Sequence, residues 1–459
     1  MSDIETQVVD DIFARSEAWE NLLALTDDIG SRMAGTQGEV AARDFLVETL
    51  RRYGLENVRA EAFPHRAWTP VREALTVTAP VTREIPCRCG GLSPSTPEGG
   101  VEAEVLFLER GDREEFKQVK DRVQGRFVVA PYYPVARQLK TPLAADFGAV
   151  GLIEARSHAG GLQPARTCAF AKVAAIPVAS ISREDADYLR RLEARKGRVR
   201  LRLTLESRVE QKDSWNVVGE IGQGVEQIVI GGHYDSWHVG PGAGDNAAGV
   251  VAVLEAARGL ARYGEHLRRR VKVALFGVEE LGLVGAWAFT HRHRDALKDT
   301  VLMVNNDVGG RPTGIGVMGA EALKSCLEPL AARVRVAGEN LPPFRVSVGG
   351  PGWGSDFFPF IAHGVPTLGI GTTPVRPEEA IYGHTRADTP DKVYKEGLTE
   401  CAAINAQVVL HVANLPERPA RQMSREEVEV YFRAHRFTET LELLEMWPPE
   451  RVVERYFSF

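Results

Sequence analysis

The sequence predicts an α/β fold in which helices cover both faces of a mostly parallel sheet. Three apolar runs carry this prediction, at residues 226–236, 271–283 and 300–310, and each of them ends in polar side chains. An amphipathic pattern at 246–264 separates the first two runs and indicates a helix. Because strands that are buried on both faces read as near-continuous apolar runs, their alternation with helices is typical of a parallel sheet.

The N-terminal part supplies further elements of the same unit. Apolar residues at helical spacing predict a helix over 39–53, and Gly54 follows it as a stop signal. Residues 58–68 alternate between apolar and polar side chains, as a strand does. Residues 81–100 are rich in Pro, Gly, Ser and Thr, which indicates that the chain crosses into a different unit.

The pattern of predicted strands and helices then changes twice. From about 101 to 204, short β-rich runs alternate with turns and with one or two short helices, which predicts a self-contained β-rich module inserted at 81–204. The main domain therefore comprises 1–80 and 205–415. The tail, 416–459, contains Ser424-x-x-Glu427, a capping-box pattern that opens a helix, and ends in aromatic residues expected to pack on the body or on another subunit.

Composition excludes several classes of function. The chain has 459 residues, 44% of them hydrophobic, and a net charge of −6 with its basic residues scattered, so no stripe suited to nucleic acid is present. An acidic start without a signal-peptide pattern, and the lack of any apolar run of about 18 residues, predict a cytoplasmic protein that does not enter a membrane. The five cysteines, with Cys87 and Cys89 as a CxC pair, are expected to be reduced.

Potential metal ligands follow each of the three apolar runs. In open α/β sheets, ligands bind at the carboxyl ends of the strands. Singly, each polar residue is more simply explained as a surface residue, a turn or a helix cap, but together at one sheet edge they indicate a site. The strand ends supply His233 with Asp235, Glu279 with Glu280, and Asp307, and two loops add Asp245 and His384.

This set of side chains suits a pair of zinc ions. Imidazole and carboxylate are zinc ligands, and a two-metal site needs one carboxylate shared between the ions. Asp235 lies two residues after His233 on the same side of an extended strand, so it can accept the second ring N–H of that histidine. Of the adjacent pair Glu279 and Glu280, one can bind metal while the other serves as a general base.

At these residues the sequence resembles the M28 family of co-catalytic zinc peptidases. The similarity is close over about 215–395, where order, spacing and flanking glycines agree with the family. The motifs that carry it are HYDSWHVGPGAGDNAAGVVAVLEAAR at 233–258, FGVEELGLVGA at 276–286, NNDVGG at 305–310, GSDFFPF at 354–360 and YGHTRADTPDKV at 382–393. The insertion is similar to the protease-associated module of several subgroups, and the chain is most similar to the plasma glutamate carboxypeptidase branch.

The resemblance implies a role for each residue of the set. It implies a zinc-peptidase (phosphorylase-like) fold with two zinc ions per chain, or other divalent metals. One ion would bind His233, Asp245 and Asp307, and the other would bind Asp245, Glu280 and His384. Glu279 would be the general base that acts on a water held between the ions, and Asp235 would orient His233. Tyr382 would donate to the developing oxyanion, although simple packing explains this tyrosine nearly as well.

The expected function is that of an exopeptidase acting on dipeptides or small peptides. Whether it is an aminopeptidase, a carboxypeptidase or a dipeptidase stays open, because acids abound and Arg376 and Arg386 flank the His384 loop. Two alternatives are a non-catalytic receptor that keeps the fold, and an amidohydrolase or acyltransferase acting on a non-peptide amide. Nucleotide binding is disfavoured because no strand is followed by GxGxxG. A homodimer is a reasonable expectation.

Overall fold

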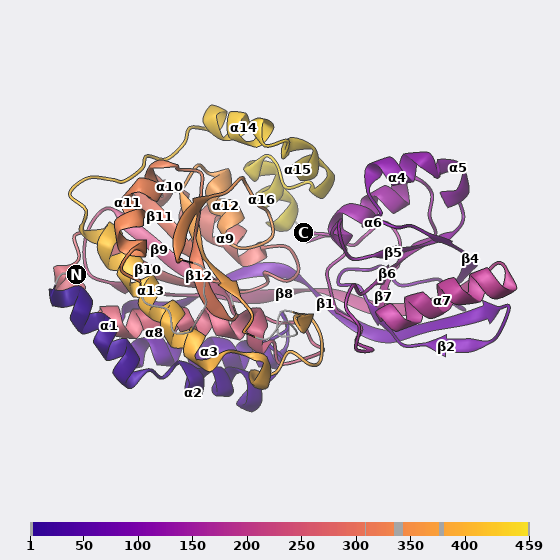
Figure 1. Cartoon of the computed structure of the whole chain (residues 1–459), viewed down its shortest axis with the longest axis horizontal. Coiled ribbons are helices and arrows are strands. Elements are labelled where there is room, and N and C mark those ends of the chain that lie inside the picture. Colours follow the sequence, from indigo (N-terminus) through magenta and orange to yellow (C-terminus); the bar gives the residue numbers. More distant parts are fainter. Residues whose placement is uncertain (1–2, 308, 335–342, 376–380, 458–459) are drawn as a thin grey trace.

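The computed structural model describes residues 3–307, 309–334, 343–375 and 381–457. Its strands form one 14-stranded sheet in the order β13-β12-β14-β11-β9-β10-β8-β4-β5-β6-β7-β3, with β1 paired to β8 and β2. Figure 1 shows two lobes joined by β1 and β8. The larger lobe contains both the N-terminal helices and most of the second half of the chain, and we call it the catalytic lobe.

The sheet of the catalytic lobe is mostly parallel, as predicted. Strand β9 lies between β10 and β11 and is parallel to both, and β11 is parallel to β14, whereas β12 and β8 run antiparallel to their neighbours β14 and β10. The strands are β9 (Gln227–His233), β10 (Arg270–Phe276), β11 (Thr300–Asn305), β12 (Arg311–Met318), β13 (Arg345–Val348) and β14 (Thr367–Thr373).

Helices cover both faces of this sheet. Successive residues of each strand point to opposite faces, so they pack into different cores. Ile228 and Ile230 of β9 belong to the core under one helical layer, whereas Val229 between them belongs to the core under the other. The first layer comprises α1 (Asp3–Arg15), α2 (Ala18–Leu23), α3 (Gln37–Arg52), α8 (Ala248–Ala261), α11 (Ala322–Ala331) and α13 (Lys395–Asn414). The second comprises α9 (Val284–Arg292), α10 (Arg294–Leu297) and α12 (Phe357–Ala362).

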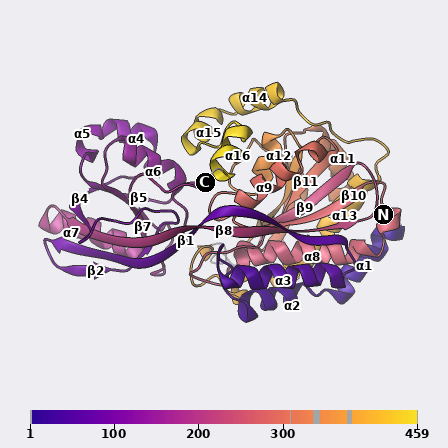
Figure 2. The same cartoon turned by 180° about the vertical axis from the view of Figure 1, so that it is seen from behind.

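Two long antiparallel strands connect the lobes. Strands β1 (Glu56–Ala79) and β8 (Arg200–Ile221) pair from Glu56 with Glu220 to Ala79 with Arg200. Figure 2, seen from behind, shows this ribbon passing from one lobe into the other. Strand β8 pairs with β10 at one end and with β4 at the other, so the sheet is continuous across the junction.

The inserted lobe contains more helix than the sequence predicted. It has four helices where one or two were expected, and all of 81–204 is described. Strands β4 to β7 are parallel neighbours, with α4 and α5 between β4 and β5, α6 between β5 and β6, and α7 after β7, which makes the lobe α/β rather than β-rich. The elements are β2 (Arg83–Ile85), β3 (Cys87–Cys89), β4 (Val101–Phe107), α4 (Arg113–Gln118), α5 (Lys120–Val123), β5 (Phe127–Pro131), α6 (Arg137–Asp146), β6 (Gly151–Ala155), β7 (Val178–Ile181) and α7 (Arg183–Lys196).

The C-terminal tail forms three helices, α14 (Arg425–Ala434), α15 (Thr438–Leu444) and α16 (Pro449–Phe457). The predicted capping box is confirmed, since Ser424 accepts from the Glu427 N–H and Glu427 accepts from that of Ser424. The tail packs on the body, as Figure 1 also shows, and the buried Tyr456 donates its hydroxyl to the carbonyl of Gly282 at 2.9 Å.

The structure also bears on two expectations drawn from composition. Of the helices in the described ranges, none is both long and apolar enough to cross a membrane. All five cysteines are free, and Cys87 and Cys89 are buried on β3.

Candidate metal centre

The predicted ligands meet at the carboxyl edge of the parallel strands. His233 is the last residue of β9, Asp307 follows the end of β11 by two residues, and the Glu279–Glu280 pair follows β10. These three strands are adjacent and parallel, so their carboxyl ends reach the same edge of the sheet. Asp245 lies in the segment before α8, and His384 comes from a loop much later in the chain.

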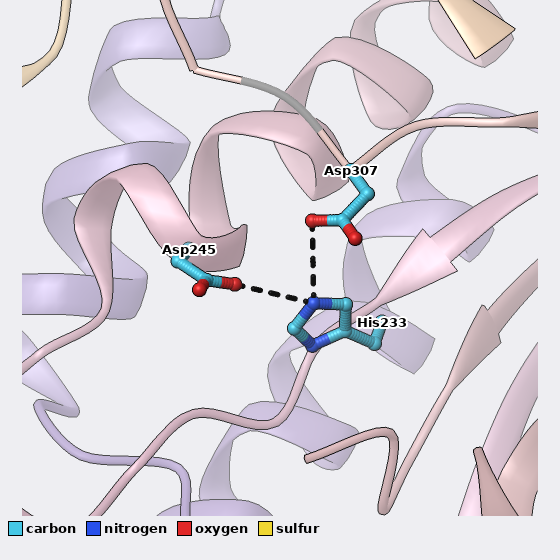
Figure 3. A group of neighbouring side chains, drawn as sticks. All are labelled: His233, Asp245 and Asp307. Carbon is cyan, nitrogen blue, oxygen red and sulfur yellow. Dashed lines mark ion pairs between the residues drawn. The ribbon is translucent and has the colours of Figure 1, made fainter. Parts of the chain in front are cut away.

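The first group comprises His233, Asp245 and Asp307. The Nε2 atom of His233 lies 3.4 Å from an oxygen of Asp245 and 3.6 Å from an oxygen of Asp307. Figure 3 shows both carboxylates directed at the same ring nitrogen. Ligands about 2.0–2.2 Å from a tetrahedral zinc ion are about 3.3–3.6 Å from one another, so this spacing suits a small cation between the three side chains.

The second group shares Asp245 with the first. The other oxygen of Asp245 lies 2.8 Å from Nε2 of His384, and that nitrogen lies 3.2 Å from Oε2 of Glu280. Asp245 therefore directs one oxygen at each histidine, which is the arrangement of a carboxylate that bridges two cations.

The electrostatics of these side chains also fit a pair of cations. Oε1 of Glu280 and Nδ1 of His384 are buried, and neither has a hydrogen-bond partner among the described residues. Burial raises the pKa of Glu279 well above its usual range, and the nearby Asp356 raises it further. Burial likewise raises the pKa of Glu280, as does the charge of Asp245. So many crowded carboxylates are costly to keep ionised unless positive charge is supplied between them.

Asp245 is held in place by two neighbouring polar side chains. The Asp388 carboxylate accepts the N–H groups of Gly244 at 2.7 Å and of Asp245 at 3.1 Å. The next residue, Asn246, follows a cis peptide bond and donates its side-chain amide to the carbonyls of His233 and Asn306. The Asn246 side-chain oxygen accepts from the Gly249 N–H at 3.1 Å, so Asn246, and not Asp245, receives the N–H at the start of α8.

Asp235 makes contacts that the sequence did not indicate. Its carboxylate is buried and lies 3.4 Å from Nδ1 of His233, and the hydrogen-bond partner of this nitrogen is the backbone carbonyl oxygen of Asp235 at 3.2 Å. The same carboxylate accepts the backbone N–H groups of Glu279 at 3.0 Å and of Glu280 at 3.2 Å. Asp235 thus fixes both acids of the pair relative to His233.

Arg32 is a further residue that sequence reasoning missed. Its guanidinium is fully buried and donates to backbone carbonyls, among them those of Tyr234 at 2.7 Å and Gly242 at 3.0 Å. It therefore clamps the loop between β9 and Asp245. Burial lowers the pKa of Arg32 to about 10, with Asp235 and Asp388 opposing the shift, so the side chain stays charged at neutral pH.

The inserted lobe holds the loop that carries His384. The Ala165 N–H donates to the carbonyl of His384 at 2.8 Å, and the Arg156 guanidinium donates to the carbonyl of Ile381 at 2.5 Å. Tyr382 lies on this loop with its ring over the ammonium group of Lys392, 5.2 Å from Nζ to the ring centroid. Of the two arginines expected near it, Arg386 is exposed and Arg376 lies outside the described residues.

Several cavities open at the ligands, and two of them lie between the lobes. The first, which we call the metal cavity, has a volume of about 180 Å³ and is lined by all five expected ligands together with Glu279. The second, the arginine cavity, has a volume of about 160 Å³. Both are lined by Asp245, His384, Tyr132 and Arg166, and Tyr382 is not among the lining residues of either.

Comparison with known proteins agrees with this geometry. Residues 216–409 match the model of Peptidase family M28. Carboxypeptidase Q of Pongo abelii is 29% identical over 426 residues, which cover 88% of this chain and 87% of that protein. Among solved structures, an M28 peptidase precursor from Shewanella amazonensis superimposes with a TM-score of 0.79 at 23% identity, covering 92% of this chain and 98% of that one.

A zinc aminopeptidase from Bacillus subtilis shares the fold with a TM-score of 0.65 at 23% identity, covering 89% of this chain and 97% of its own. The matched family segment contains all of the residues that converge on the metal cavity from the catalytic lobe, from His233 to His384. Residues 216–409 are thus similar to peptidase family M28, and most of the chain is similar to carboxypeptidase Q, which supports a metallo-exopeptidase.

Proposed function

We propose that this enzyme is a dinuclear zinc exopeptidase that hydrolyses dipeptides or other small peptides. The observation that carries the proposal is the Asp245 carboxylate, one oxygen of which faces His233 while the other faces His384. His233, Asp245 and Asp307 would hold one ion, and Asp245, Glu280 and His384 the other. When bound, such a pair of ions supplies the positive charge that polarises a carbonyl and makes water nucleophilic near neutral pH.

Glu279 is the proposed general base. It lines the metal cavity, its Oε2 is 3.9 Å from Nε2 of His233, and its backbone N–H is bonded to Asp235. From this position its carboxylate can accept a proton from the attacking water and pass it to the leaving amine nitrogen. Tyr382 stays a prediction as the oxyanion donor.

The space around the ligands is divided among several cavities. The metal cavity and the arginine cavity have volumes of about 180 and 160 Å³, and two more cavities that are lined by Asp307 have volumes of about 230 and 660 Å³. The preference for small peptides therefore rests on the family resemblance and stays a prediction. The domain division at 81–204, a homodimer and a cytoplasmic location stay predictions.

Two adjacent substitutions test the roles proposed for the acid pair. Glu279→Gln should keep both zinc ions and lower kcat by about 10²–10⁴-fold, because it removes the base and no ligand. Glu280→Gln should lower the bound zinc measured by mass spectrometry from two ions per chain towards one. A Glu279→Gln protein with near wild-type turnover would contradict the base assignment, and a wild-type stoichiometry of one would contradict the dinuclear site.

A further inference from the structure

The loop that carries Glu279 and Glu280 has a strained backbone. It spans residues 277–283, between β10 and α9, and we call it the acid loop. Val278 and Leu283 both adopt left-handed φ angles, of 59° and 61°, although neither is a glycine. Bulky residues rarely adopt this conformation, and it persists only where surrounding contacts hold it in place. The contacts of this loop therefore decide where the two acids lie.

Gly282 is the residue at which three parts of the chain meet. Its N–H donates to the carbonyl of Glu279 at 2.8 Å, which closes a turn around the two acids. A Cβ at Gly282 would lie 2.9 Å from that of Phe170 in the inserted lobe, so the close approach of the lobe requires a glycine here. The carbonyl of Gly282 accepts the hydroxyl of Tyr456, which belongs to α16. Gly282 thus links the acid loop both to the inserted lobe and to the C-terminal tail.

Tyr456 is well placed to hold the end of the acid loop. Its side chain is buried, which raises its pKa to about 12, so the hydroxyl keeps its proton and donates at neutral pH. Figure 1 shows its helix, α16, beside α9, the helix into which the acid loop leads. Asp235 holds the N–H groups of Glu279 and Glu280 at the start of the turn, whereas Tyr456 holds a carbonyl at its end.

The tail is also tied to the inserted lobe next to the acid loop. Glu445 of the tail pairs with Lys172 of the inserted lobe, and it lies 2.6 Å from Nη1 of Arg455 on α16. The neighbouring Ala171 donates its N–H to the carbonyl of Leu281, within the acid loop, at 3.0 Å. The tail therefore supports the acid loop directly through α16 and indirectly through the inserted lobe.

We propose that Tyr456 is a positioning residue, whose hydrogen bond to Gly282 holds Glu279 where it can take the proton of the attacking water. The inference rests on the proposed function, because it assumes that Glu279 is the general base. A base acts only within hydrogen-bond reach of the proton that it removes, so a small displacement of the loop lowers the rate without removing the base itself. The tail thereby contributes to catalysis, although none of its described residues lines the metal cavity.

Removal of a single hydroxyl group tests this assignment. Tyr456→Phe keeps the buried ring, so the fold should be retained, and kcat for a dipeptide should fall about 10-fold with KM and the number of bound zinc ions unchanged. Tyr431→Phe is the matched control, because Tyr431 lies on the same tail and donates its hydroxyl at 3.2 Å to the carbonyl of Gly349, outside the acid loop. Equal losses of kcat in the two variants would overturn the proposal.

A double-mutant cycle asks whether Tyr456 acts through Glu279. In the Glu279→Gln background, Tyr456→Phe should lower the residual kcat by less than about 2-fold, because the group that it positions is already absent. A loss of about 10-fold in both backgrounds would overturn the proposal, since the tyrosine would then act independently of the base.

Amide hydrogen exchange, measured by mass spectrometry on a peptide covering residues 278–286, gives a readout without turnover. The N–H groups of Gly282 and Leu283 both donate to the carbonyl of Glu279, and their exchange should be about 5–10-fold faster in Tyr456→Phe and unchanged in Tyr431→Phe. If the wild type hydrolyses no peptide but this difference is found, the proposed function fails and the support of the acid loop by Tyr456 stands. If the wild type hydrolyses peptides, but neither kcat nor exchange changes in Tyr456→Phe, only the role of Tyr456 fails.

Discussion

The two histidines of the site are supported in different ways. His233 ends a central strand of the sheet, is 1% exposed, and lies within 4 Å of the carboxylates of Asp235, Asp245, Glu279 and Asp307. His384 has a positive φ of 62°, lies on a loop, and is held from the inserted lobe. One half of the site is therefore part of the core, and the other half is assembled by a contact between lobes.

Replacing each histidine in turn should give the largest difference between the two halves. His233→Ala should lower the free energy of unfolding of the metal-free protein by about 2–4 kcal/mol, because it leaves a cavity among buried carboxylates. His384→Ala should change it by less than about 1 kcal/mol, although both variants lose activity. Urea unfolding of the metal-free proteins measures both values. Equal destabilisation by the two variants would remove the distinction.

Arg156→Gln should weaken only the half that depends on the inserted lobe. Without the bond to the Ile381 carbonyl, the affinity of the His384 side for zinc should fall by about 10–100-fold, the effect typical of groups that support metal ligands. Chelator-competition titration should then resolve one weakened and one unchanged zinc. Arg122→Gln, an exposed substitution in the same lobe, is the control. The comparison is wrong if both affinities fall together.

Asp388→Asn should have a smaller effect, shared by both ions. Its carboxylate accepts the N–H groups of Gly244 and Asp245, and Asp245 belongs to both groups of ligands. Each zinc affinity should therefore fall by about 10-fold in the same titration. Asp391→Asn changes an exposed carboxylate near the same turn and should leave both affinities as they are. A loss confined to one ion would show that Asp245 is not shared.

The catalytic lobe could be predicted from the sequence because its signals are local. The three parallel strands are apolar runs, and the edge at which they end was expected to gather His233, Glu279 and Asp307. Asp245 and His384 lie on loops, so their places in the set came from the chemistry of two-metal sites and from the family resemblance. The short helices α4 and α5, of six and four residues, are too short to give a clear periodic pattern.

The supporting residues could not be predicted because their partners are distant in sequence. Arg32 bonds to Gly242, 210 residues later, and Asp388 bonds to Asp245 across 143 residues. A single arginine or aspartate in a polar segment does not show in the sequence which distant residue it will contact.

Because β1 and β8 run through both lobes, the inserted lobe cannot be cut out at residues 81 and 204 without breaking strand pairs. Residues 200–203 of β8 lie between β4 and the end of β1, so this cut would remove β1 from the lobe and leave the edge of β8 unpaired. A chimera that exchanged this lobe for that of a relative would have to carry both arms of the ribbon with it.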